Sequence, residues 1–402
     1  MEIEGKFVHS VRLGELEFFE GSLEIDSKGI IRQTQMQKKK LKLTNSQFVI
    51  PGFVDTHTHA PQFVNSGTGI DLPLLEWLEK YTFPAEAKFD NLDYAQSIYE
   101  KVVDAYLRNG TTTCCYYGTI HAKSSYALAK IMEEKGQRGF VGKVCMDRNS
   151  PEYYTEETEE SIEQTFEFLN MMNGFEIVKP VVTPRFAPSC SDFLMTELGK
   201  IARGKDLLIQ THLSENKDEV EWMKTLYPTK SYTQVYKDFD ILTDRTVMAH
   251  CIHLDETEID ILKETNVGIA HCANSNFNLN SGIFPLRERL NDGLRIGLGT
   301  DNSGGTSISM LDAIRYSMTA SKLLNQPVNV AELFHLATLG GAEVLRLENI
   351  GNFEEKKAFD ALIIDVGHEI ENLELEFEKF LFSGDLTMIK QVFVAGKVVY
   401  SK

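Results

Sequence analysis

The sequence lacks several features that would place it in a special class of protein. It does not open on the basic and then apolar segments of a signal peptide, and no stretch approaches the roughly 18 consecutive apolar residues of a membrane span. Its six cysteines are scattered, with no C-x-x-C pair and no compact framework. We therefore expect a cytoplasmic protein with reduced thiols, and we interpret Cys114 and Cys115, in an apolar stretch, as core residues.

Positive charge is also in short supply. The chain carries 41 Lys and Arg against 59 Asp and Glu, a formal net charge of -18. Nucleic acids and anionic membranes would repel such a chain, so we expect neither as a partner. Its 402 residues are 42% hydrophobic, which is enough for a large core, and a small neutral ligand fits the charge better.

The two ends of the chain have strand-like patterns. GKFVHSV, LEFFEGSLEID and IIRQTQ (residues 30–35) come first, and FDALIIDV and IKQVFVAGKVVY come last. The basic run at residues 38–40 is interpreted as a solvated loop. We expect residues 1–50 and 351–402 to form one small β-sandwich domain around a different middle, residues 51–350.

The middle alternates apolar strand-like runs with amphipathic segments, some ending in a glycine such as Gly110 or Gly174, where a helix C-cap is expected. The eight runs are FVIPGFVDTHTH, TTTCCYYGT, FVGKVCM, VKPVVTPRF, DLLIQTHLSE, RTVMAHC, VGIAHC and LRIGLGTD. Eight β–α repeats predict an α/β fold with a parallel (β/α)8 TIM-type barrel.

Polar residues gather where these runs end. In PGFVDTHTHA, His57 and His59 are two residues apart, so an extended chain projects both to one face, with Asp55 below. Such a pair can be a hydrogen-bonded core feature or part of a metal site. Later runs end in a further set of polar residues: Arg185, His212, His250, His271 and Asp301. Because chemistry in such barrels sits at the C-terminal strand ends, the set predicts one site with zinc-type N and O ligands.

Spacing alone leaves some roles open. It does not decide which of His250 and His271 touches metal or substrate, and Asp301 could form only an Asx turn. Glu215 follows His212 and precedes an expected capping box of Asn216 and Glu219, which leaves Glu215 outside the helix. It is either a solvated loop carboxylate or a proton shuttle beside a metal. Lys179 stands at the opposite end of its run from Arg185, so we interpret it as structural and expect one metal.

These motifs resemble a known family. HTH at His57, THLSEN around Glu215, MAHC at His250, HCANSN at His271 and GTD at Asp301 are similar to the amidohydrolase superfamily. Longer blocks, among them GIDLPLLEWLEKYTFPAE, VTPRF and ATLGGAEVLRL, resemble the guanine deaminase family within it. The resemblance implies a distorted (β/α)8 barrel, a homodimer, and deamination of guanine at C2 to xanthine and ammonia in purine catabolism.

The same resemblance implies roles for individual residues. One Zn2+ per chain would be held by His57, His59, His212 and Asp301. Glu215 would shuttle protons, while His250, with Asp301, would hold the attacking water. The substrate-binding residues would be Gln62 and Arg185, which grip the purine, Phe186 against its ring, and His212, Glu215 and Asp301 beside it.

Two departures and two alternatives accompany this reading. Ala273 stands where proline is more usual in the HCPNSN block, and NSG occupies residues 302–304; we expect both to line the pocket. A related deaminase acting on a pterin is the alternative within enzymes, and an inert amidohydrolase-like scaffold is the alternative outside them. The HxE and PCxxC signature of the other zinc base-deaminase architecture is absent from the sequence.

Overall fold

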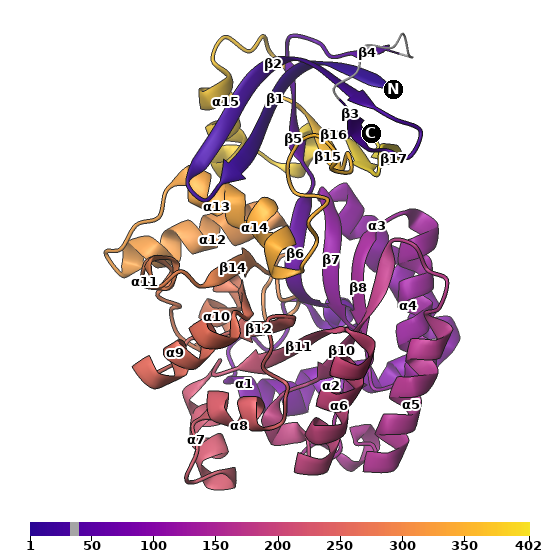
Figure 1. Cartoon of the computed structure of the whole chain (residues 1–402), viewed down its shortest axis with the longest axis vertical. Helices are drawn as coiled ribbons and strands as arrows, with labels where there is room; N and C mark the ends of the chain where they lie inside the picture. Colours follow the sequence, from indigo (N-terminus) through magenta and orange to yellow (C-terminus); the bar gives the residue numbers. More distant parts are fainter. Residues whose placement is uncertain (33–39) are drawn as a thin grey trace.

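The computed structural model describes residues 1–32 and 40–402. A barrel with helices on its outside occupies most of the molecule, and a smaller sheet containing both chain termini lies at one end (Figure 1). The expected α/β fold with a (β/α)8 barrel is confirmed, and both chain ends contribute to one separate sheet. Of the strand expected over residues 30–35, the described part is β3 (Ile31–Arg32); the remainder lies outside the described residues, as do Lys38 and Lys39 of the basic run.

The barrel strands run parallel in the order of the sequence, with β9 as a short extension that pairs with β10. They are β6 (Phe53–His59), β7 (Thr111–Tyr117), β8 (Arg138–Gly142), β9 (Val144–Cys145), β10 (Val178–Pro184), β11 (Leu208–Leu213), β12 (Thr246–His250), β13 (Gly268–His271) and β14 (Arg295–Leu298). The first and last strands meet through individual hydrogen bonds. Thr56 Oγ1 donates to Leu298 O at 2.9 Å, and Asp301 N donates to His57 O at 3.0 Å. The barrel is therefore distorted at this seam.

The smaller sheet combines both ends of the chain in the order β17-β16-β15-β5-β1-β2-β3, with β4 also paired to β1. Its other strands are β1 (Glu2–Arg12), β2 (Glu15–Ile25), β4 (Lys40–Lys42), β5 (Gln47–Pro51), β15 (Ala361–Asp365), β16 (Ile389–Val394) and β17 (Lys397–Ser401). Successive side chains of β5 face opposite sides. Val49 packs in the sheet's own core, whereas Phe48 and Ile50 pack in the core shared with the barrel.

The first apolar run of the middle, residues 48–59, was expected to be one strand, and the structure divides it. β5 belongs to the small sheet and β6 to the barrel, with only Gly52 between them. A Cβ at Gly52 would come within 2.2 Å of Thr112 Oγ1, so only glycine allows this close approach. A continuous apolar pattern hides the division because both strands are buried.

Helices cover the outside of the barrel and the junction with the sheet (Figure 1). They are α1 (Leu74–Trp77), α2 (Phe83–Ala87), α3 (Leu92–Arg108), α4 (Ala122–Lys135), α5 (Thr158–Met171), α6 (Asp192–Lys205), α7 (Lys217–Leu226), α8 (Tyr232–Asp238), α9 (Glu256–Thr265), α10 (Ala273–Asn278), α11 (Leu286–Asn291), α12 (Met310–Leu323), α13 (Val330–Leu336), α14 (Leu339–Val344) and α15 (Leu373–Ser383). As predicted, glycines in the left-handed region follow α3 and α5, with φ of +80° at Gly110 and +93° at Gly174. Helix α15 lies in an end for which only strands were expected; its Phe380 ring packs against Phe48 at 6.1 Å between centroids.

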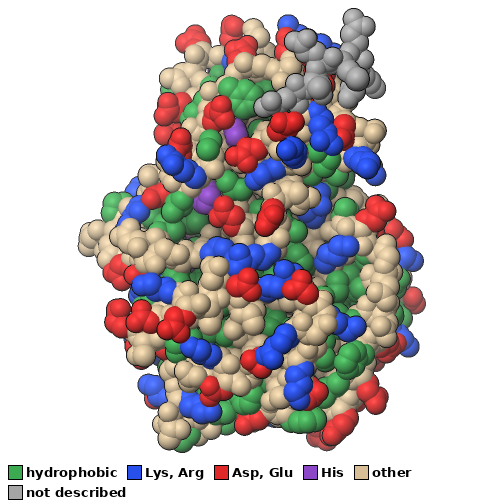
Figure 2. All heavy atoms as spheres, in the orientation of Figure 1, with side chains coloured by type: hydrophobic (Ala, Val, Ile, Leu, Met, Phe, Trp, Pro, Cys, Tyr) green, Lys and Arg blue, Asp and Glu red, His purple; other side chains and the backbone are tan. Residues whose placement is uncertain are grey.

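The face seen in Figure 2 carries acidic and basic side chains interspersed with each other. Cys114 and Cys115 are fully buried, as expected of core residues. Within the described part of the chain, no helix combines the length and apolar character needed to cross a membrane.

Candidate active site

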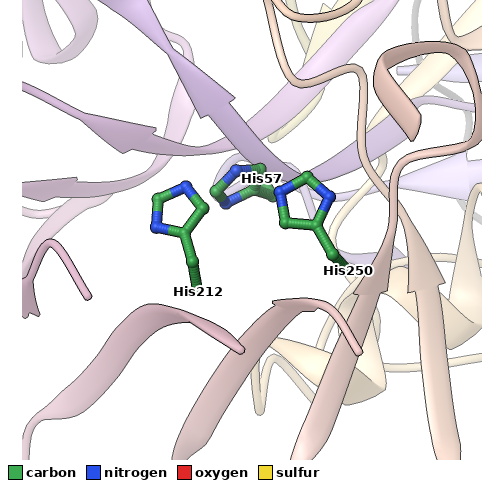
Figure 3. Close-up of side chains that lie close together, drawn as sticks. All are labelled: His57, His212 and His250. Atoms are coloured by element: carbon green, nitrogen blue, oxygen red, sulfur yellow. The ribbon is translucent and has the colours of Figure 1, made fainter. Parts of the chain in front are cut away.

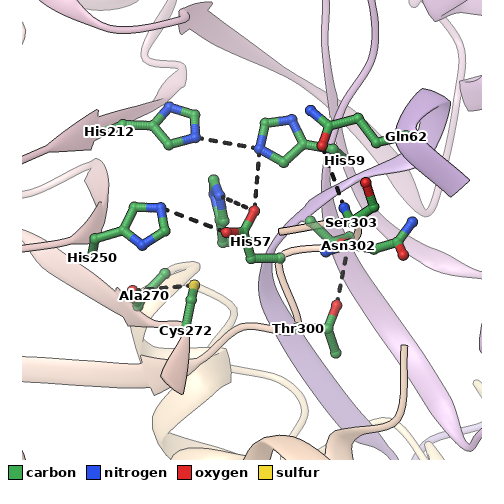
Figure 4. Close-up of polar contacts among 12 residues, drawn as sticks. His57, His59, Gln62, His212, His250, Ala270, Cys272, Thr300, Asn302 and Ser303 are labelled. Atoms are coloured by element: carbon green, nitrogen blue, oxygen red, sulfur yellow. Dashed lines mark hydrogen bonds and ion pairs between the residues drawn. The ribbon is translucent and has the colours of Figure 1, made fainter. Parts of the chain in front are cut away.

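Four histidines from three barrel strands point toward one centre (Figures 3 and 4). His57 and His59 lie at the end of β6, and His212 and His250 lie at the ends of β11 and β12. The Nε2 atoms of His59 and His212 are 3.3 Å apart, and the rings of His57 and His212 are 4.8 Å apart between centroids. Three parallel strands that end at one rim thus bring together residues up to 193 positions apart in the chain, since His57 and His250 belong to one cluster.

Asp301 completes this cluster from the loop after β14. Its Oδ1 lies 3.2 Å from His57 Nε2 and 3.4 Å from His59 Nε2, and its Oδ2 lies 3.7 Å from His250 Nε2. Ligand atoms of His57, His59 and Asp301 all fall within 4.8 Å of one another, as do those of His57, His212 and His250. Asp301 and His250 have left-handed φ values of +48° and +70°, conformations that non-glycine residues adopt at a cost and that cluster at functional sites.

The charge states of the cluster suit a cation. Burial, reinforced for His59 and His212 by the neighbouring histidines, lowers the pKa of His57, His59 and His212, so these rings stay neutral. Burial alone would raise the pKa of Asp301, but His57 and the other rings outweigh it and hold that pKa well below its usual range. Neutral imidazoles facing an ionised carboxylate are the ligand forms that a divalent metal requires.

Outer hydrogen bonds fix which ring nitrogens face the centre. His212 Nδ1 donates to the carbonyl of Arg185 at 2.7 Å, and His250 Nδ1 donates to Asn276 Oδ1 at 2.8 Å, so it is Nε2 of each ring that faces the centre. His57 Nε2 and His250 Nε2 are buried without a hydrogen-bond partner among the described residues. The orphaned Nε2 of His57 at the centre of the cluster fits a metal ion, because a ligand bond would compensate its burial.

Asp55 supports the cluster from behind. It is fully buried and accepts hydrogen bonds from His57 N at 3.2 Å and from Thr300 N and Oγ1 at 3.1 and 2.5 Å. Burial raises the pKa of Asp55 to about 7. The side chain therefore ties the end of β6 to the loop that carries Asp301.

Glu215 occupies the mouth of the barrel, as its place in the sequence predicts. The capping box of Asn216 and Glu219 that begins α7 is confirmed, and Glu215 lies just before it. Glu215 is only 5% exposed, its Oε2 is 3.4 Å from His250 Nε2, and its Oε1 accepts from Ser281 Oγ at 3.2 Å. Burial raises the pKa of Glu215 to about 7 although His250 opposes the shift, so the group can gain or lose a proton near neutrality.

The cluster opens onto a cavity that is also lined by the residues expected to bind a ligand. Its wall includes Gln62, Arg185 and Phe186 together with Glu215 and three of the four clustered histidines, without His57. Leu74, Trp77 and Leu78, from α1 and the turn after it, line the same cavity. The segment between β6 and α3 therefore forms part of the wall over the strand ends.

Two other sequence candidates fall outside this arrangement. His271 is 1% exposed and packs against Phe284, with ring centroids 4.9 Å apart; burial lowers its pKa to about 3. It is absent from the cavity wall and from the groups of close ligand atoms, so the choice left open by spacing falls on His250. Lys179 is exposed and donates to Phe175 O at 2.6 Å, away from the cluster.

The departures at residues 302–304 and Ala273 differ in position. Gly304 lines the cavity, but Ala273 is the first residue of α10 and is not part of the wall, contrary to our expectation.

Sequence reasoning missed Glu86, which is fully buried at the end of α2. Its carboxylate accepts from Arg185 Nη1 at 2.6 Å and Nη2 at 3.2 Å, and from Gln62 Nε2 at 2.8 Å. No spacing rule links these residues, because Glu86 and Arg185 are 99 positions apart. The one available clue was its place at the end of the block GIDLPLLEWLEKYTFPAE.

Comparison with known proteins agrees with this geometry. The family model described as "Amidohydrolase family" matches residues 48–399 of this chain. The chain belongs to the amidohydrolase family. Among curated relatives of this amidohydrolase, the guanine deaminase of Dictyostelium discoideum is 45% identical over 98% of this chain and 97% of its own length, and that of Homo sapiens is 45% identical over 98% and 95%.

Among solved structures, this amidohydrolase is likewise similar to a guanine deaminase. The crystal structure of guanine deaminase from C. acetobutylicum with bound guanine in the active site has a TM-score of 0.95, with 35% identity and 99% of both chains covered. The chain thus spans nearly the full length of its relatives and reproduces the fold of a guanine-bound member.

Proposed function

We propose that this amidohydrolase is a zinc-dependent guanine deaminase, which hydrolyses guanine at C2 to xanthine and ammonia. One observation carries the proposal. A single cavity combines the histidine–aspartate cluster, a buried acid whose pKa is raised to about 7, and the donors Arg185 and Gln62. The near-full-length relatives named guanine deaminase support the choice of substrate.

A single zinc ion would be held by His57, His59, His212 and Asp301, which supply three neutral nitrogens and one carboxylate. When bound, such an ion lowers the pKa of a water molecule toward neutrality and so provides hydroxide at physiological pH. His250 would orient the attacking water through Nε2, since its Nδ1 is already committed to Asn276.

Glu215 moves the protons. Because the pKa of Glu215 is about 7, its carboxylate can accept a proton from the attacking water and then deliver it to N3 of the base, which makes C2 more electrophilic. Addition of the nucleophile at C2 is followed by a proton transfer to the amine and by cleavage of the C2–N bond, which releases ammonia. The hydrogen bond from Ser281 keeps the carboxylate at this position.

Arg185 and Gln62 select the base. The guanidinium has donors only, so it requires acceptors, and guanine offers O6 and N7. Adenine carries an amino group in place of O6 and would leave buried donors facing another donor. Phe186 packs in the same wall, and Leu74, Trp77 and Leu78 help to exclude bulk water.

The direct test is to incubate the purified protein with guanine and to follow the products. We expect xanthine and ammonia in equal amounts, and loss of the activity after chelation followed by recovery with zinc. Guanine that stays intact with a fully metal-loaded protein would contradict the proposal. The homodimer and the cytoplasmic location remain part of the proposal, and sedimentation analysis tests the former.

A further inference from the structure

The carboxylate of Glu86 has a complete set of hydrogen-bond partners. Oε2 accepts from Arg185 Nη1 at 2.6 Å and from Tyr154 Oη at 2.9 Å, while Oε1 accepts from Gln62 Nε2 at 2.8 Å and from Arg185 Nη2 at 3.2 Å. A carboxylate has about four lone-pair sites, and these four bonds fill them. Glu86 therefore has no acceptor left for a ligand, and it is not part of the cavity wall.

Arg185 is held rigidly as a result. Its side chain is 3% exposed, the fork to Glu86 is bidentate, and its guanidinium lies 5.0 Å from the ring centroid of Phe83, which is also in α2. The fork uses two of the five N–H donors, so three remain for other partners. Arg185 is in the cavity wall, which makes the cavity the place where remaining donors can meet a ligand.

The same carboxylate decides how Gln62 is turned. Because an ionised carboxylate only accepts hydrogen bonds, Gln62 must present its amide nitrogen to Glu86. Its Oε1 then accepts from Ser303 N at 3.3 Å, and the second N–H of the amide has no hydrogen-bond partner among the described residues. Both residues assigned to the base thus take their orientation from one buried acid.

We propose that Glu86 is the positioning residue for base recognition: it orients the donors of Arg185 and Gln62 toward the 6-oxo group and N7 of a purine without touching the purine. The inference rests on the proposed function, since it assumes that a 6-oxopurine enters this cavity. It also links recognition to the wall of the cavity, because Glu86 lies in the last turn of α2, which follows the cavity-lining segment with Trp77 and Leu78.

The test compares binding of two purines that differ at one position. Hypoxanthine keeps O6 and N7 but has no 2-amino group to lose, whereas unsubstituted purine lacks O6. Equilibrium dialysis measures the dissociation constant of each compound. Glu86→Gln places an amide donor against the guanidinium and breaks the fork. Because charge-assisted hydrogen bonds contribute strongly to binding, the ratio of the dissociation constants of unsubstituted purine and hypoxanthine should fall by roughly tenfold or more. Zinc content should be unchanged.

Two further variants separate positioning from general damage. Glu86→Asp keeps the charge that neutralises Arg185 but is one methylene shorter, so the preference should fall again, and this variant serves if Glu86→Gln does not fold. The control is Glu156→Gln, which disrupts the buried ion pair between Glu156 and Lys143, outside the cavity wall. It should leave the preference as in the wild type.

The outcomes are distinct. A lower preference in both Glu86 variants, with wild-type metal content, supports the assignment. An unchanged preference in a folded Glu86→Gln or Glu86→Asp protein overturns it, even while the wild type deaminates guanine. A wild type that neither deaminates guanine nor prefers hypoxanthine overturns the proposed function itself.

Discussion

Replacing Glu215 with glutamine removes the proposed proton carrier with little change in shape. Glu215 is 5% exposed, and its carboxylate lies 3.4 Å from His250 and 3.2 Å from Ser281. The isosteric amide still accepts from Ser281, so the protein should fold and bind zinc normally. It has no basic oxygen that can take up a proton near pH 7.

The magnitude follows from what the other groups near the cavity can do. His250 is assigned to orienting the water and not to carrying its proton to the base. Glu86 accepts four hydrogen bonds and has no free acceptor site, and Glu219 already accepts three. The whole general acid–base contribution should therefore be lost. We expect kcat for guanine to fall by about 10² to 10⁴.

The assay is steady-state turnover of guanine with zinc content measured on the same sample. Glu219→Gln is the matched control, since it makes the same chemical change four residues away while an amide oxygen can still accept from the backbone of the capping box. Its effect should stay within about tenfold, below the range of a lost general acid–base. A Glu215→Gln enzyme with full zinc and near wild-type kcat would refute the shuttle.

Three further predictions concern the metal, the base and stability. Elemental analysis should find one zinc per chain, and a reproducible content of two that is required for activity would contradict the single-metal site. Arg185→Met should reduce kcat/KM for guanine by at least about 10² through loss of charge-assisted hydrogen bonds, with zinc retained, whereas loss of zinc would place the arginine at the metal. Burial lowers the pKa of His335 to about 4, so the unfolded chain binds protons more readily and stability should fall by roughly 3 kcal/mol as pH drops from 6.5 to 4. Denaturant titrations at several pH values should show that the stability of His335→Asn falls by roughly 3 kcal/mol less over this pH range than that of the wild type. The same loss of stability in both proteins would show that His335 is not the group responsible.

Local patterns predicted the parts of the fold that depend on local chemistry. Each of the eight apolar runs overlaps a barrel strand, because period and composition mark strands that are buried on both faces. The capping box of Asn216 and Glu219 could be predicted because its hydrogen bonds join residues that are close in sequence. The convergence of His57, His212 and His250 followed from a single topological rule about strand ends.

What the sequence concealed depends on contacts between distant segments. The division of residues 48–59 between two sheets is enforced by the close approach of Gly52 to Thr112, which no periodicity reveals. The choice of His250 over His271 required the rings to be placed in space. Glu86 meets Arg185 only through the tertiary fold, and its own neighbours in sequence do not distinguish it from a surface acid.

The most direct test of the central claim is kcat/KM for guanine, adenine and a pterin, measured side by side on the same zinc-loaded protein. Donors that require O6 and N7 predict that guanine is the best substrate, that a pterin with the same amidine and carbonyl edge is at most weaker, and that adenine is lower by roughly 10⁴ or more. A pterin preferred over guanine would assign the enzyme to the alternative substrate. Efficient turnover of adenine would contradict the role of Arg185 and Gln62 in choosing the base.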